Sequence, residues 1–266
     1  MKAKAKKKQE ISKPWTISTN RYVGFLDIMG FKDMLARMSH EKVYELMKSV
    51  SSSVSSVQSV FTIDYESEND DDERIEVNVT MMLYSDSIMI YTRDDEQHSL
   101  DNLITSISEL SLSLFNDGIP HKGAIAYGQM TLDFEKSIFF GQPLVDAYLL
   151  QDELKYYGIV VHGTAETNGD ILNNESIIEY NCPFKTGVAK HLTIAPGVEL
   201  SDEFDVVTVT ELKEKVENLR TRTSGALRKY IDNTADYLDV VKKKGEEILK
   251  EAELEDVDET EENGGS

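Results

Sequence analysis

The chain has 266 residues, a formal net charge of −21 and 40% hydrophobic residues. This length allows one well-packed core with appendages, or two small domains. The negative charge argues against nucleic acid as the main partner, and no apolar run approaches the ~18 residues of a membrane span, so we expect neither a nucleic-acid nor a membrane partner. Cys182 is the only cysteine. An internal disulfide is therefore excluded, and a reducing cytoplasm is the simplest location.

The two ends of the sequence carry opposite charge. Five of residues 2–8 are lysines, and no apolar signal-peptide core follows them. Residues 246–262 carry ten carboxylates and one lysine. We therefore predict a flexible basic arm over residues 1–20, in preference to an arm that binds RNA or acidic lipid, and a disordered acidic tail over residues 250–266.

The predicted elements alternate between strands and amphipathic helices. A strand apolar on both faces (22–28) comes first, and Gly30 opens a helical pattern in which apolar residues recur at spacings of three and four from Phe31 to Val57. A polar break (66–74) separates this helix from two strands joined at Ser85-Asp86. The predicted segments from there on are strands 76–84 and 87–92, a helix 100–115, strands 122–127 and 131–140, a helix 144–157, a strand 159–162, an irregular or helical stretch 168–181, a strand 204–208, and helices over 210–249 interrupted near Gly225.

This order of elements predicts an α+β sandwich, with helices on one face of a mostly antiparallel sheet. We assign residues 21–209 to this domain and residues 210–249 to a helical extension. In such a sheet Asp27, at the end of the first strand, and Asp86, at the hairpin tip, can lie side by side.

These two aspartates interrupt segments that are otherwise apolar. A buried carboxylate is costly unless it is paired, hydrogen-bonded or bound to a metal. Two carboxylates on neighbouring strands indicate a site for Mg²⁺ or Mn²⁺, with backbone N–H groups of residues 28–31 available to cradle a triphosphate. The alternative is that Asp27 caps the following helix and Asp86 merely occupies a turn.

Around these residues the sequence resembles the class III nucleotide cyclases. Phe25-Leu-Asp-Ile-Met-Gly-Phe31 is similar to their first metal motif, F-x-D-I-x-G-F, and Tyr84-Ser-Asp-Ser-Ile88 to the hairpin that carries their second metal aspartate. With Tyr84-Ser-Asp-Ser, the segments Lys122-Gly-Ala-Ile-Ala-Tyr-Gly and Gly141-Gln-Pro-Leu-Val-Asp-Ala-Tyr most resemble the pyrimidine cyclases of the bacterial Pycsar antiphage system. The resemblance covers residues 22–162.

The resemblance implies a cyclase-like (ferredoxin-like) sandwich that acts as a homodimer, with active sites at the subunit interface. It implies two metal ions, Mn²⁺ or Mg²⁺, held by the carboxylates of Asp27 and Asp86 and by the carbonyl of Ile28. It also implies conversion of UTP, or CTP, to a 3′,5′-cyclic nucleotide and diphosphate, the product acting on a separate effector protein in antiphage defence. The substrate would lie against residues of both motifs, namely Phe25, Met29, Gly30, Phe31, Met82 and Tyr84.

Two departures from the family pattern concern the base. Purine cyclases place a base-reading lysine four residues before the second metal aspartate, where this chain has Met82, and a polar partner at the position of Ile138. Neither side chain can make the hydrogen bonds that read adenine or guanine. The sequence therefore disfavours a purine substrate without choosing between UTP and CTP.

A third departure concerns the transition-state arginine, which has no counterpart in residues 141–150. Lys122 is the candidate catalytic cation in its place, with Arg21 and Arg93 as weaker candidates and a structural role for Lys122 as the alternative. The missing arginine favours the competing hypothesis, a catalytically degenerate cyclase fold that binds nucleotide as a sensor.

Overall fold

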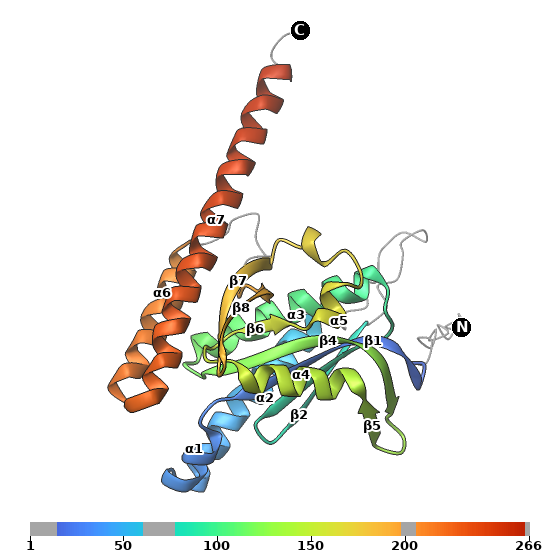
Figure 1. The fold of residues 1–266 in the computed structure, drawn as a ribbon, viewed down its shortest axis with the longest axis vertical. Coiled ribbons are helices and arrows are strands. Elements are labelled where there is room, and N and C mark those ends of the chain that lie inside the picture. The colour runs from blue at the N-terminus through green and yellow to red at the C-terminus, as the bar shows by residue number, and fades with distance from the viewer. Residues whose placement is uncertain (1–14, 61–77, 198–205, 264–266) are drawn as a thin grey trace, which may run out of the picture.

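The structure is a computed structural model that describes residues 15–60, 78–197 and 206–263, the side chains of 206–208, 249 and 251–263 excepted (Figure 1). The first 14 residues of the predicted basic arm lie outside the described residues. So do the polar break at 66–74, the start of the strand predicted at 76–84 and the last three residues of the chain.

The described strands form one eight-stranded sheet in the order β2-β3-β1-β4-β6-β8-β7, with β5 paired to β4. Neighbours are antiparallel except for the parallel pair β4 and β6. The strands are β1 (Ser18–Ile28), β2 (Val79–Tyr84), β3 (Ser87–Thr92), β4 (His121–Asp133), β5 (Ile138–Gly141), β6 (Ile159–Val161), β7 (Ile177–Phe184) and β8 (Gly187–Ile194). The predicted α+β class with a mostly antiparallel sheet is confirmed.

Helices cover both faces of this sheet (Figure 1). The helices are α1 (Phe31–Arg37), α2 (His40–Val60), α3 (Gln97–Asn116), α4 (Gln142–Glu153), α5 (Gly163–Glu166), α6 (Val206–Asn218) and α7 (Arg228–Asn263). Helices α2 and α3 pack on what we call the first face, and α4, α6 and α7 on the second face.

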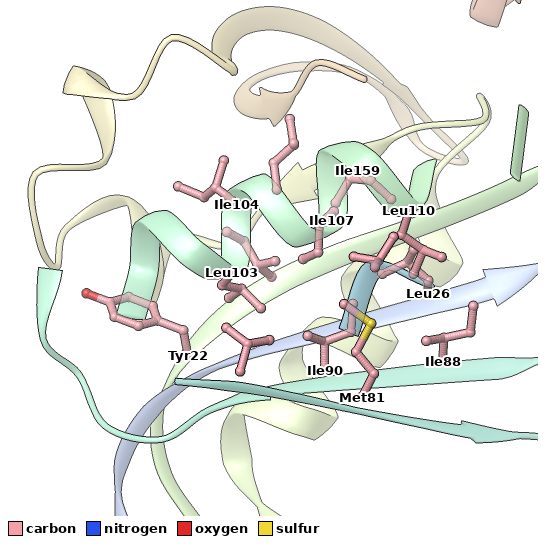
Figure 2. Packing of buried hydrophobic residues seen from close by; sticks show 14 of the residues in the cluster. Tyr22, Leu26, Met81, Ile88, Ile90, Leu103, Ile104, Ile107, Leu110 and Ile159 are labelled. Atoms are coloured by element: carbon pink, nitrogen blue, oxygen red, sulfur yellow. The ribbon is translucent and has the colours of Figure 1, made fainter. Parts of the chain in front are cut away.

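The two apolar layers explain why the prediction of helices on one face is wrong. Figure 2 shows Leu26 of β1 and Ile90 of β3 packed against Ile107 of α3 in the first layer. The next residue back on β1, Phe25, belongs to the second layer. A strand that is apolar on both faces needs cover on both.

Several predicted elements differ from the structure in their bounds or type. The long helix predicted from Phe31 is divided into α1 and α2, because Met38 adopts an extended conformation between them. The strand predicted over 131–140 is split by a turn into the end of β4 and β5. The stretch 168–181 predicted as irregular or helical runs into β7, and β8 was not predicted.

The two terminal segments predicted to be flexible or disordered contain more regular structure than the sequence indicated. β1 starts at Ser18, inside the predicted arm, and α7 continues to Asn263, through most of the segment predicted as a disordered tail. Glutamate, leucine and alanine favour helix, and no glycine or proline interrupts residues 246–263. In Figure 1 the end of α7 extends past the sheet. None of the described helices is long and apolar enough to cross a membrane.

Candidate functional site

Two rows of side chains cross the second face of the sheet where β1 ends. Directly opposed residues of antiparallel strands point to the same face, with Cβ atoms about 5 Å apart. The first row, from β2 to β4, is Tyr84, Ser87, Asp27 and Lys122. The second row, two residues away along each strand, is Met82, Met89, Phe25 and Ala124. The structure therefore brings four predicted site residues and Lys122 onto one surface.

Asp86 reaches Asp27 from the tight turn between β2 and β3. Ser85 in this turn has a positive φ of 56°, and the Ile28 N–H donates to the Asp86 carbonyl at 2.9 Å. Asp86 thus occupies a turn, as the alternative reading held, and also lies beside Asp27. Asp27 is not a helix cap, because Gly30 is the residue before α1 and no side chain caps that helix.

Burial and like charge both act on Asp27. Desolvation, followed by the charge of Asp86, raises the pKa of Asp27 to about 6, against an opposing effect of Lys122 and a further increase from Asp152. Such a raised pKa is expected where two carboxylates share a partly buried site. A divalent cation between them would relieve this repulsion.

Lys122 is buried, at 4% exposure, and its ammonium group is already engaged. Lys122 Nζ donates to the Asp152 carbonyl at 3.1 Å and lies 3.9 Å from Asp152 Oδ1. Burial lowers the pKa of Lys122, while Asp152 and Asp27 raise it. These contacts place Lys122 between the end of α4 and the Asp27 carboxylate.

Two of the four amides at the turn from β1 into α1 are already engaged in hydrogen bonds. The Ile28 N–H binds the Asp86 carbonyl and the Met29 N–H binds the Pro120 carbonyl at 2.8 Å. The prediction that the amides of 28–31 cradle a triphosphate is therefore wrong for these two residues. Gly30 has φ of 83°, a conformation that favours glycine, and it is exposed, whereas Phe31 is buried.

The residues predicted to meet the base do not come together within one chain. Met82 lies in the second row, whereas Ile138 on β5 pairs with Asp133, eleven residues along β4 from Lys122. At about 3.3 Å per residue this is about 36 Å along the strand. Tyr84 is 76% exposed at the rim of the sheet.

Arg21 does not serve the site, because it lies six residues before Asp27 and is buried. Its guanidinium donates to the Thr92 and Thr16 carbonyls at 3.1 and 2.6 Å.

Helix α4 supplies two site residues that the sequence did not reveal. The Tyr148 ring packs edge-on against Phe25 at 5.4 Å between centroids, and Asp152 binds Lys122. Both depend on α4 lying over β1 and β4, as Figure 1 shows. The apolar spacing that predicted this helix contains no signal for where it crosses the sheet.

The two carboxylates fit a hard divalent cation that shares its ligands with a nucleotide. Among the described residues, no group of three or more His, Cys, Asp or Glu side chains is placed to hold a metal ion. Mg²⁺ and similar ions often use only one or two protein carboxylates together with substrate phosphates. The carboxylates of Asp27 and Asp86, together with the Ile28 carbonyl at the same end of β1, offer the oxygen ligands that such an ion uses.

No protein-family model and no curated protein matches the chain. Among solved structures, it is similar to the catalytic core of a rhodopsin-guanylyl cyclase with converted specificity in complex with ATPαS, with a TM-score of 0.49 and 11% identity over 67% of this chain and 96% of the other.

Two further solved structures are similar to it. The guanylyl cyclase Cya2 has a TM-score of 0.48 and 12% identity over 72% of this chain and 98% of the other. A bacterial light-regulated adenylyl cyclase has a TM-score of 0.47 and 13% identity over 66% and 51%. All three TM-scores lie below 0.5.

Proposed function

We propose that the chain is a metal-dependent nucleotide cyclase that converts UTP, or CTP, to the 3′,5′-cyclic nucleotide and diphosphate. The observation that carries this proposal is the meeting of Asp27 and Asp86 at one end of the sheet, in the order and spacing of the motifs that the sequence shares with class III cyclases. The raised pKa of Asp27 supports a cation site, since the apo carboxylates repel each other.

The reaction needs few groups from the protein. The ribose 3′-oxygen attacks the α-phosphorus, the bond from that phosphorus to the diphosphate oxygen breaks, and the hydroxyl proton passes to solvent. A bound Mn²⁺ or Mg²⁺ pair would lower the pKa of the hydroxyl and offset charge on the diphosphate. Asp27 and Asp86 would hold the ions with the Ile28 carbonyl, and the Phe25 and Tyr148 rings border the site.

An apolar base site supports a pyrimidine substrate. Met82 faces Met89 and Phe25 across the second row, and none of these side chains offers a strong hydrogen bond to a purine edge. Ile138, the other base position, could meet Met82 only across two copies of the chain. The preference for UTP or CTP thus rests on apolar residues at both positions.

Exposed apolar side chains support a homodimer. Val145, Tyr148 and Leu149 lie on one side of α4 and are each about half exposed. Leu35 and Met38, at the end of α1 and just beyond it, are also exposed. A second copy covering these side chains would bury an apolar surface that a monomer leaves in water. Because Lys122 itself is covered within the chain, we place α4 and the end of α1 in the proposed interface, and not the strand that carries Lys122.

One observation favours the sensor alternative. The ammonium of Lys122, the candidate catalytic cation, is bound to Asp152. The chain thus has two carboxylates suited to a metal ion, but the ammonium group at the predicted catalytic position is not free to contact substrate. A sensor would bind nucleotide and metal without turnover.

The deciding experiment incubates the pure protein with an equimolar mixture of the four NTPs and Mn²⁺ and identifies products by mass spectrometry. We expect cyclic UMP or cyclic CMP from the parent and none from Asp27→Ala or Asp86→Ala, with Asp170→Asn as an exposed aspartate control. Cyclic AMP or cyclic GMP as the main product would contradict the base assignment. Nucleotide binding without any cyclic product would establish the sensor instead.

The biological setting that we propose follows from the resemblance to Pycsar cyclases. The cyclic pyrimidine nucleotide would act on a separate effector protein during phage infection, in the cytoplasm, where the single buried thiol of Cys182 stays reduced. Loss of phage protection on Asp86→Ala substitution, in cells that carry the cognate effector, would be the expected result.

A further inference from the structure

A buried lysine sits against the candidate metal carboxylates. Lys122 lies opposite Asp27 in the register of β1 and β4, and the charges of the two groups interact. Its side chain is 4% exposed, so this interaction is only weakly screened by solvent.

The position of Lys122 is fixed from the other side by the end of α4. Asp152 lies in the last turn of that helix, where carbonyl groups lack intrahelical partners and carry partial negative charge. Lys122 Nζ donates to the Asp152 carbonyl. Turning the ammonium toward a substrate would break this bond and leave a buried charge without its partner, which is costly.

Asp152 is in turn held by a second lysine. Lys185, in the turn between β7 and β8, places Nζ 2.6 Å from Asp152 Oδ2, and its N–H donates to the Glu153 carbonyl at 2.8 Å. The end of α4 is thus tied to two different parts of the sheet.

Ammonium groups offset much of the negative charge around the site, where Glu153 also lies 3.9 Å from Lys185 Nζ. The groups whose charges act on Asp27 or Lys122 are three carboxylates (Asp27, Asp86 and Asp152) and three ammonium groups (Lys122, Lys155 and Lys185). The positive charge of Lys122 acts on Asp27 and weakens the attraction of the aspartate pair for a divalent cation, whereas a nucleoside triphosphate brings several negative charges of its own.

We propose that Lys122 is a built-in counter-ion of the Asp27–Asp86 pair: held in place by Asp152, it keeps cation binding weak in the free protein, so that the metal binds together with the nucleotide. Lys122 is then a positioning residue that acts through Asp27, and it does not touch the substrate. This inference rests on the proposed function only in taking the aspartate pair as the metal site.

The test measures Mn²⁺ binding without nucleotide at pH 8, from the electron paramagnetic resonance signal of free Mn²⁺. Lys122→Met removes the charge but keeps the length, and we expect it to bind Mn²⁺ about tenfold more tightly than the parent. Lys122→Arg keeps the charge and should bind like the parent. Lys136→Met is the matched control, because Lys136 is an exposed lysine paired with Asp133 at the far end of β4.

A second variant separates this role from a purely structural one. Asp152→Asn keeps the carbonyl group that binds Lys122 but removes the carboxylate, so we expect Mn²⁺ to bind two- to threefold more weakly. Damage to the fold would weaken binding in both variants, whereas the counter-ion role shifts the two affinities in opposite directions. Unchanged or weaker Mn²⁺ binding in a folded Lys122→Met protein would overturn the inference. The proposed cyclase reaction would fail separately, through the lack of any cyclic product from the parent.

Discussion

Asp27→Asn should make the metal-free protein more stable at pH 8. The carboxylate is forced to ionise in a partly buried site beside Asp86, and this raises its pKa from 3.8 to about 6. At 1.36 kcal/mol per pH unit, ionisation costs the folded state about 3 kcal/mol. Partial solvent access reduces this to about 1–3 kcal/mol. An asparagine of the same shape carries no such cost.

The pH dependence has a definite sign. Because the pKa of Asp27 is higher in the folded than in the unfolded protein, the folded state holds the extra proton between pH 4 and 6, and stability falls as pH rises through this window. The gain from Asp27→Asn is therefore full above pH 7, falls to about half at pH 5 and vanishes below pH 4.

Thermal unfolding in EDTA measures this gain. For a domain of this size, 1–3 kcal/mol corresponds to a rise in Tm of roughly 2–12 °C. Asp170→Asn, at an exposed aspartate without a capping hydrogen bond, should leave Tm within about 1 °C. An Asp27→Asn protein that melts at or below the parent's Tm at pH 8 would show that burial and the charge of Asp86 do not make ionisation of Asp27 costly.

Three further outcomes follow from the structure. If the proposed dimer forms through α4, Leu149→Glu should make the protein monomeric in sedimentation velocity and reduce turnover more than tenfold, while Leu172→Glu, at another exposed leucine, should do neither. Gly123→Ala should lower the free energy of unfolding in urea by about 1–3 kcal/mol, because its Cβ would lie 2.7 Å from the Phe25 carbonyl oxygen; Gly163→Ala, with open space around it, is the control. Excess EDTA should abolish all cyclic product, and Mn²⁺ should restore it.

The part of the site that depends on neighbouring strands could be predicted from the sequence. Asp27 ends an apolar strand and Asp86 stands between two strands with no room for a long loop, so the two aspartates can meet when the first strand pairs with the hairpin, as β1 does with β3. The strand β3 was predicted with its observed bounds for the same reason, since its alternation and its turn are local features.

Predictions failed where tertiary packing overrode local preference. The segment 204–208, predicted as a strand, contains several β-branched residues, yet its described part, 206–208, forms the start of α6, whose Val209 and Leu212 pack into the second layer. Residues 187–191 on β8 are exposed or half-exposed and show no apolar alternation, which is why that strand was missed.

The role expected of Lys122 from the sequence differs from the contacts that it makes in the structure. The sequence makes Lys122 the candidate catalytic cation, because residues 141–150 lack the arginine of the family pattern. In the structure the Lys122 ammonium instead donates to the Asp152 carbonyl. A cyclase built on this chain needs positive charge near the leaving diphosphate. The metal ions can supply part of this charge. Residues 141–150 contain no lysine or arginine, so we propose that the remainder comes from a second copy of the chain, which would pack on the apolar surface of α4 beside Phe25. On this reasoning Lys122→Arg should preserve turnover, because arginine keeps the positive charge that offsets the carboxylates, and in our proposal this charge takes no part in bond breaking.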